Sequence, residues 1–200
     1  TNDIENQEFY TGGVDARLAH QYSALGSEEH VLTGGVLYYH TTSPRLDSRG
    51  ALGDADTGVL RKDADRTVDT LSFFAENLFK FGKFSITPGV RLESIWQSIQ
   101  ENLNADKVTV PLANDEESEF EVLGGIAAQV EVTTEIDLYA NFSEGYRPKI
   151  FTQSVPNGTN QIVNDNLKAG RSWQADAGVR GKLFRPWSWD ASVFHMEFDD

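Results

Sequence analysis

The stretch RSWQADAGVRGK, residues 171–182, decides the fold. Its side chains alternate in polarity without error. The odd-numbered positions are Trp173, Ala175, Ala177 and Val179, and the even-numbered positions are Gln174, Asp176, Gly178 and Arg180. Because a β-strand sends successive side chains to opposite faces, this stretch predicts a strand with one apolar face and one polar, charged face.

The same period runs through the rest of the chain, and no helical period competes with it. It predicts eight strands, at residues 7–22, 29–42, 70–81, 84–99, 119–132, 136–147, 171–182 and 188–199. Gly82-Lys83 separates two of these strands and is a tight hairpin signal. Pro88 lies within the strand that follows, so we expect it at a bulge or near the strand start. The predicted fold class is all-β, antiparallel and up-and-down.

The breaks between the predicted strands are alternately short and long. The long breaks are polar and cover residues 44–69, 101–118 and 148–170. Outer-membrane barrels have this distribution, with short turns on the periplasmic side and long loops outside. A soluble β-sandwich would show the same strand period, but its loops need not alternate in length so regularly.

The predicted apolar faces of the strands also suit a bilayer. Charged residues are missing from the middle of nearly all of these faces, which is expected because a charge facing lipid costs about 2–4 kcal/mol at the bilayer midplane. Aromatic residues lie near strand ends, where an interface girdle would place them: Tyr10, Phe84, Trp96, Trp173 and Trp189. These features favour a transmembrane β-barrel over the soluble alternative.

Composition excludes several classes of protein. Seventeen basic and thirty-one acidic residues give a net charge of −14, which argues against a nucleic-acid partner. Cysteine is absent, so there is no disulfide framework. No apolar run approaches the roughly 18 residues of a spanning helix, and no signal peptide opens the chain. Both ends read like the interior of a longer sequence, so we expect a fragment of a larger protein.

Four segments resemble TonB-dependent outer-membrane receptors of the siderophore and ferric dicitrate type. They are TLSFFAENLFKFGKFSITPGVRLE (70–93), LYANFSEGYRPKIF (138–151), NDNLKAGRSWQADAGVRGK (164–182) and SWDASVFHMEFDD (188–200). The resemblance covers most of residues 70–200 and identifies the superfamily, not the substrate. One departure is that Gly170 and Asp176 stand where glutamates are usual in this family. That departure weakens single positions and leaves the resemblance intact.

The resemblance implies a transmembrane barrel of about 22 strands, of which about eight lie in this chain. Residues 1–200 would all belong to the barrel domain, and the plug domain would not be present in this chain. It further implies an outer-membrane location in a Gram-negative bacterium and import of a scarce ligand, above all a ferric chelate. The implied partners are that ligand, the TonB system acting through the plug, and outer-membrane lipid and lipopolysaccharide. No enzymatic activity and no cofactor are expected.

Ligand contacts are predicted in the long loops and at strand ends. Ferric siderophores and ferric citrate are usually anionic chelates, and the arginine fork binds carboxylates well. The candidates are Arg45, Arg49, Arg147 and Lys149, with Gln153 and Asn160 as weaker ones. For any one of them, the competing interpretation is a solvated, charge-balanced loop.

Metal and catalytic interpretations are weaker. Acidic pairs such as Asp54/Asp56 and Asp63/Asp65 could bind calcium or the ions that bridge lipopolysaccharide, but no EF-hand spacing supports this. The four histidines lack metal-binding or catalytic spacing, so neither kind of site is predicted. The alternative functions are a passive outer-membrane porin or small complete β-barrel, and a soluble β-sandwich binding module.

Overall fold

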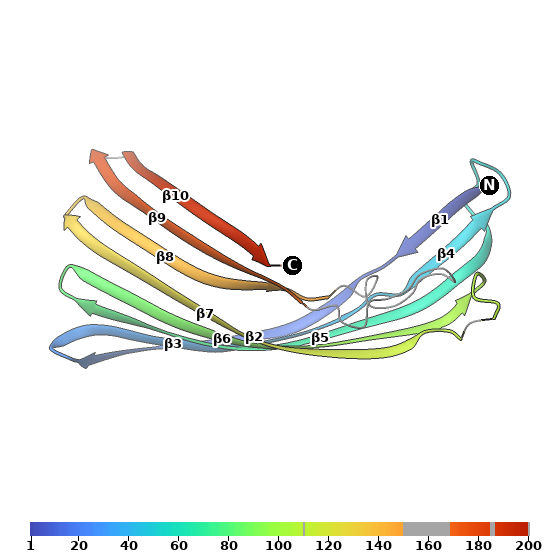
Figure 1. Cartoon of the computed structure of the whole chain (residues 1–200), viewed down its shortest axis with the longest axis horizontal. Helices are drawn as coiled ribbons and strands as arrows, with labels where there is room; N and C mark the ends of the chain where they lie inside the picture. The colour runs from blue at the N-terminus through green and yellow to red at the C-terminus, as the bar shows by residue number, and fades with distance from the viewer. Residues whose placement is uncertain (110, 150–168, 185–186, 200) are drawn as a thin grey trace.

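The computed structural model describes residues 1–109, 111–149, 169–184 and 187–199. In this part of the chain, ten strands form one antiparallel sheet, which is curved (Figure 1). The strands are β1 (Asn2–Gln7), β2 (Tyr10–Ala24), β3 (Ser27–Thr42), β4 (Arg45–Gly50), β5 (Val59–Phe81), β6 (Phe84–Asn104), β7 (Asn114–Thr133), β8 (Ile136–Arg147), β9 (Gly170–Phe184) and β10 (Trp187–Asp199). The described residues contain no helix long and apolar enough to cross a bilayer.

The first four strands form two long segments, β1 with β2 and β3 with β4, and each segment is interrupted once. β2 pairs with β3 and β1 pairs with β4, so the breaks between β1 and β2 and between β3 and β4 lie side by side. Pro44 has no N–H to continue a ladder. The N–H of Ser43 instead donates to the Arg66 carbonyl of β5 at 2.7 Å, and the N–H of Glu8 donates to the Pro44 carbonyl at 3.2 Å. From β5 to β10 each strand pairs with the next in chain order, which confirms the up-and-down, partial-barrel prediction.

All eight predicted strands are present, and the differences lie at their long-loop ends. Residues 44–69 were predicted as a loop, yet they contain β4 and the start of β5. β6 continues to Asn104, and β7 begins at Asn114. These extensions are polar on both faces. Backbone pairing therefore continues there without the alternation that identifies a half-apolar strand.

The tight turn predicted at Gly82-Lys83 is present, and a second tight turn joins β2 to β3. Gly82 alone has a positive φ, of 60°, in the Gly82-Lys83 turn between β5 and β6, as a type II′ hairpin requires. Leu25 and Gly26 both have positive φ, 51° and 79°, which is the requirement of a type I′ turn between β2 and β3. Pro88 lies near the start of β6, at a gap in the β5–β6 ladder that leaves the register unchanged.

The sheet has an apolar face and a polar face. On the apolar face Phe73, Val90 and Ile126 are 50%, 44% and 44% exposed, so no other layer of the described chain covers them. The strand register places charged side chains of β6 and β9 together on the opposite side: Arg91, Glu93, Asp176 and Arg180.

The polar face is the concave one. Side chains that lie two strands apart meet on it, because curvature brings them together. The Tyr146 hydroxyl of β8 donates to Glu93 of β6 at 3.0 Å, across β7. The Arg180 guanidinium of β9 donates to Gln129 of β7 at 2.7 Å, across β8. The apolar face is therefore convex, which is the arrangement of a barrel with a greasy exterior.

Aromatic groups flank the apolar band on the convex face. The register places all five aromatic residues named above on this face. The Trp173 ring lies 6.0 Å from Phe142 and 5.1 Å from His195, measured between ring centroids. At the short-turn end, His30 packs 5.3 to 5.6 Å from the rings of Tyr22, Phe79 and Phe81.

His30 has a structural role rather than a metal-binding one. It is fully buried, and its Nδ1 accepts a hydrogen bond from the N–H of Lys80 at 3.0 Å. Nε2 therefore carries the proton and donates to the Ala24 carbonyl at 2.8 Å. The imidazole thus completes the backbone hydrogen bonding where the β3–β5 ladder ends at Val31.

Candidate functional site

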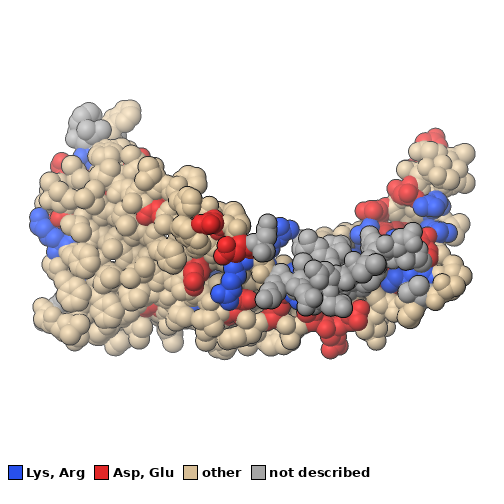
Figure 2. Space-filling model, viewed as in Figure 1, with Lys and Arg blue, Asp and Glu red and all other residues tan. Residues whose placement is uncertain are grey.

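The long-loop end of the sheet carries a cluster of charged side chains. Here β1, β4, β5, β6 and β7 extend beyond the apolar band, and the charges gather over them (Figure 2). We call this set the mouth cluster; its members are Asp3, Glu5, Arg45, Asp47, Arg49, Arg61, Lys62, Arg66, Glu101, Asp106 and Lys107. Six basic and five acidic residues make this set nearly balanced in charge, in a chain whose net charge is −14.

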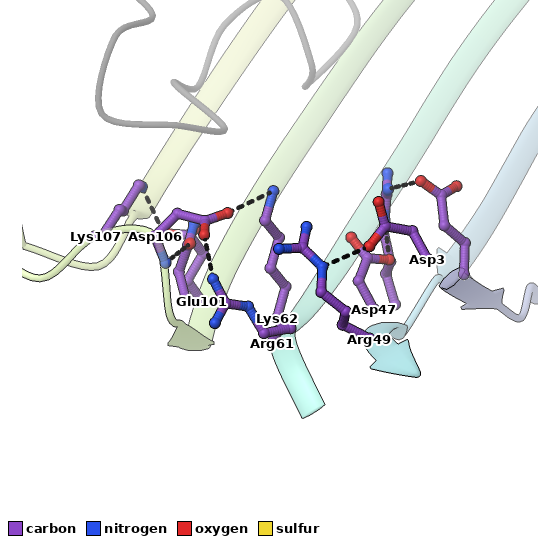
Figure 3. Close-up of polar contacts among 11 residues, drawn as sticks. Asp3, Asp47, Arg49, Arg61, Lys62, Glu101, Asp106 and Lys107 are labelled. Carbon is purple, nitrogen blue, oxygen red and sulfur yellow. Dashed lines mark hydrogen bonds and ion pairs between the residues drawn. The ribbon is translucent and has the colours of Figure 1, made fainter. Parts of the chain in front are cut away.

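Glu101 organises the connection between β6 and β7 (Figure 3). Its carboxylate accepts hydrogen bonds from the Lys107 ammonium at 2.6 Å, the Ala113 N–H at 2.7 Å and the Asn104 amide at 2.9 Å. The side chains of Glu101 and Lys107 are only 6% and 3% exposed. Burial raises the pKa of the Glu101 carboxyl, but these hydrogen bonds and the Lys107 charge outweigh burial and lower it overall. Glu101 is therefore ionised and holds the connection against the sheet.

Asp106 ties the same connection to β5. Its carboxylate accepts a hydrogen bond from the Arg61 guanidinium at 2.6 Å, and the Lys62 ammonium lies 3.7 Å away. A backbone hydrogen bond joins the same two segments, because the N–H of Ala105 donates to the Arg61 carbonyl at 2.8 Å. The hydrogen bond from Arg61 lowers the pKa of the Asp106 carboxyl.

Arg45 and Arg49, both predicted ligand contacts, are engaged by carboxylates. The Arg45 guanidinium donates to Asp47 and to Glu5, each at 2.9 Å, and its side chain is 18% exposed. Arg49 donates to Asp3 at 2.8 Å. These hydrogen bonds raise the pKa of both guanidinium groups, which tie β4 to β1.

The other predicted contacts lie around the connection between β8 and β9. Arg147 is exposed and makes no hydrogen bond or ion pair with the described residues. The Lys149 ammonium pairs with Glu117 and lies 3.8 Å from Glu119, both on β7. Gln153 and Asn160 lie outside the described residues.

Lys149 approaches the mouth cluster along the concave face. Its carbonyl accepts a hydrogen bond from the Gln97 side chain of β6 at 3.0 Å. Gln97 lies two residues from Ile99, which pairs with Arg66 of β5. The fold thus places Arg45, Arg49 and Lys149 on the same face of the sheet.

Sequence reasoning predicted only Arg45 and Arg49 of the mouth cluster as site residues and missed the other nine members: Asp3, Glu5, Asp47, Arg61, Lys62, Arg66, Glu101, Asp106 and Lys107. Recognising residues 59–69 as a strand would have placed Lys62 and Arg66 on one face. No sequence signal pairs Glu101 with Lys107, because their contact depends on how the connection folds back.

Metal binding finds no support in the described part of the chain. No group of three or more His, Cys, Asp or Glu side chains there could hold a metal ion. Asp63 and Asp65, one of the acidic pairs considered, instead accept hydrogen bonds from the Asn102 amide at 3.5 and 3.1 Å.

The comparison with known families decides the identity of the fold. The chain matches the family described as TonB dependent receptor-like, beta-barrel, over residues 1–200. The chain belongs to this family. The resemblance seen in four segments is thereby confirmed along the whole sequence. No curated protein sequence matches the chain.

Solved TonB-dependent receptors and related transporters share the fold. The unliganded ferric citrate transporter FecA aligns with a TM-score of 0.76 at 15% identity, over 98% of this chain and 28% of FecA. The ferric-catecholate import receptor Fiu from K12 E. coli gives 0.72 at 14% identity, over 97% of this chain and 32% of Fiu. The ferric yersiniabactin uptake receptor FyuA from Yersinia pestis gives 0.71 at 17% identity, over 98% and 29%.

These identities establish the fold alone. The chain spans about a third or less of the length of each solved structure that it matches. The family and these neighbours are transport receptors rather than enzymes.

Proposed function

We propose that the chain forms part of the wall of an outer-membrane receptor that imports an anionic ferric chelate in a TonB-dependent manner. Family membership supports the receptor and its outer-membrane location. Three fold neighbours are named for ferric citrate, ferric catecholate or ferric yersiniabactin. Lipid hydrocarbon would cover the convex apolar face, and the partners beyond this chain would be a plug domain and the TonB system.

The mouth cluster is the observation that carries the ligand class. The mouth cluster places six of the seventeen basic residues of the chain, four of them arginines, at the long-loop end of the sheet. Basic groups held together at an opening can attract anions from solution. Guanidinium groups then recognise carboxylate or catecholate oxygens by paired hydrogen bonds.

The proposed mechanism is binding without catalysis. The chelate would enter from the long-loop side and contact the concave face. Among the predicted contacts, Arg147 is exposed and unpaired within the described residues, so it can meet a ligand directly. Arg45, Arg49 and Lys149 would have to exchange carboxylate partners for the ligand. Gln153 and Asn160 remain weaker candidates.

Binding and uptake of labelled chelates test this function. The complete protein, purified in detergent, is expected to bind radiolabelled ferric citrate or another anionic ferric chelate saturably. Cells that produce it are expected to accumulate the label only while TonB is active. Failure to bind any ferric chelate would contradict the proposal. Uptake that persists without TonB would favour the passive porin.

A further inference from the structure

Arg66 differs from every other basic residue of the mouth cluster. Arg45, Arg49, Arg61, Lys62 and Lys107 each have a carboxylate oxygen within 4.0 Å. Arg66 has no such partner among the described residues, and its Nε is both shielded from solvent and without a hydrogen bond. The Nε of Arg61 is also unpaired, but its terminal nitrogen reaches Asp106.

The surroundings of Arg66 make an unpaired guanidinium costly. Burial lowers the pKa of Arg66, and the like charge of Arg45 lowers it further, whereas Asp47 and Glu101 oppose these effects from a distance. Both of those carboxylates already have closer basic partners. An arginine that keeps its charge in such a place gains most from an anion that arrives with the ligand.

The backbone holds Arg66 in a fixed position. Arg66 pairs with Ile99 of β6 on one side, and its carbonyl accepts the N–H of Ser43 at 2.7 Å on the other. Ile99 and Ser43 are 5% and 6% exposed. The guanidinium therefore stands on a rigid part of the sheet, just beyond the apolar band. Rigid support of this kind suits a residue that selects a ligand.

We propose that Arg66 binds a carboxylate, or a comparable anionic oxygen, of the incoming ligand and determines specificity for anionic chelates. This inference rests on the proposed function, because it identifies the ligand contact within the same site. Arg61, which is held by Asp106, then acts as a positioning residue for the connection between β6 and β7. Arg66 supplies the free hydrogen-bond donors.

Three variants of the complete receptor test the assignment. Arg66→Gln removes the charge, and Arg66→Lys keeps the charge but loses the planar guanidinium. Arg17→Gln removes a guanidinium paired with Asp15 on β2, outside the mouth cluster, as a matched control. The probes are ferric citrate, iron-free citrate and a neutral ferric trihydroxamate, with affinities measured by calorimetry. Heat-modifiable mobility on gels confirms that each variant is folded.

We expect Arg66→Gln to weaken ferric citrate and citrate binding by about tenfold to a hundredfold. The affinity of Arg66→Lys should fall between those of Arg66→Gln and the unmodified receptor, and the affinity of Arg17→Gln should stay within a few-fold of the unmodified receptor. Equal losses in Arg66→Gln and Arg17→Gln would overturn the assignment in favour of general electrostatics. Unchanged affinity in Arg66→Gln, with or without reduced stability, would overturn it as well.

The probes separate this inference from the proposed function. A receptor that binds only the neutral ferric chelate keeps the uptake of a ferric chelate, but it overturns the anionic ligand class and the Arg66 assignment. A receptor that binds citrate through Arg66 but no ferric chelate keeps the assignment and overturns the uptake of iron. Absence of binding to all three probes would overturn both.

Discussion

Glu101 shows how one carboxylate can order a whole connection between strands. It satisfies the buried Lys107 ammonium and the Ala113 N–H, which lie on either side of residues 108–112. Neither partner has another carboxylate within the described residues. Glu101 therefore makes the buried contacts of this part of the mouth, and Asp106 and Ala105 add the contacts with Arg61.

Replacing Glu101 with alanine should destabilise the protein strongly. It leaves the Lys107 ammonium buried without its counter-charge, which costs about 3–5 kcal/mol. The matched control is Asp106→Asn, whose side chain is 43% exposed and should cost less than about 1 kcal/mol. Urea unfolding of the complete protein in vesicles gives the free energies, and cleavage after Lys107 by a lysine-specific protease reports the local effect. Equal effects of the two variants would contradict the role of Glu101.

The lowered pKa of Glu101 predicts a pH dependence. A group whose pKa is lower in the folded state contributes stability that is complete above its unfolded pKa, here an ordinary value of 4.5. That contribution is lost as the pH falls through the lower, folded pKa. The stability difference between the natural protein and Glu101→Gln should therefore be constant above pH 4.5 and shrink below it. Unfolding free energies measured across this range check the sign, and a difference that grows on acidification would contradict it.

At the scale of the element, the two short turns differ in how well their residues suit them. Gly82 adopts its positive φ without strain because it has no Cβ. Leu25 adopts a φ of 51°, where its Cβ comes close to the following carbonyl oxygen. Leucine is an unusual first residue for a type I′ turn, where asparagine is preferred. Leu25 is 74% exposed, so its side chain gains little burial in return.

Leu25→Asn should therefore stabilise the β2–β3 hairpin by about 1 kcal/mol, since asparagine tolerates the left-handed region better. Leu25→Val is the matched control, because a β-branched residue opposes positive φ still more and should destabilise the hairpin. Urea unfolding in vesicles measures both variants. A leucine that proves as stable as asparagine would show that the turn does not have this geometry in solution.

The strands within the apolar band were predictable from sequence, and their extensions were not. β9 contains the alternating stretch that decided the fold, and its partner β8 was predicted with the correct bounds. A strand with lipid on one side must alternate apolar and polar residues, so it can be recognised from its sequence. β4 and the start of β5 have polar surroundings on both sides, so nothing in their sequence had to alternate.

The candidate site was only partly predictable for the same reason. Arg45 and Arg49 lie at the long-loop end as predicted, and their role as ligand contacts stays a prediction. Their carboxylate partners could not be identified from the sequence. Arg66 was passed over as one charge in a polar loop. Whether an arginine is paired or free depends on which strands lie next to it, and that information is absent from the local sequence.

At the scale of the molecule, the sheet has two unpaired edges within the described residues. β10 pairs only with β9, and β1 and β2 pair on one side only. Hydrocarbon cannot satisfy the N–H and C=O groups of an open edge. In a membrane both edges would have to pair with further strands, so this sheet would be one sector of a larger barrel.

The central claim is that lipid covers the convex face and that the concave face lines an aqueous or protein-filled interior. The chain contains no cysteine, so single cysteines can be introduced along it without background from its own residues. Spin labels placed one at a time along β6, at residues 84–93, sample both faces of one strand. Collision with oxygen reports hydrocarbon, and collision with a polar nickel complex reports water.

In the complete protein reconstituted in vesicles, the convex positions Ile86, Val90 and Leu92 should be accessible to oxygen and protected from nickel. The concave positions Ser85 and Thr87 should be protected from oxygen. Accessibility should thus alternate with a period of two residues. Nickel access at the convex positions, or no difference between the two faces, would contradict a lipid-covered barrel wall and with it the receptor.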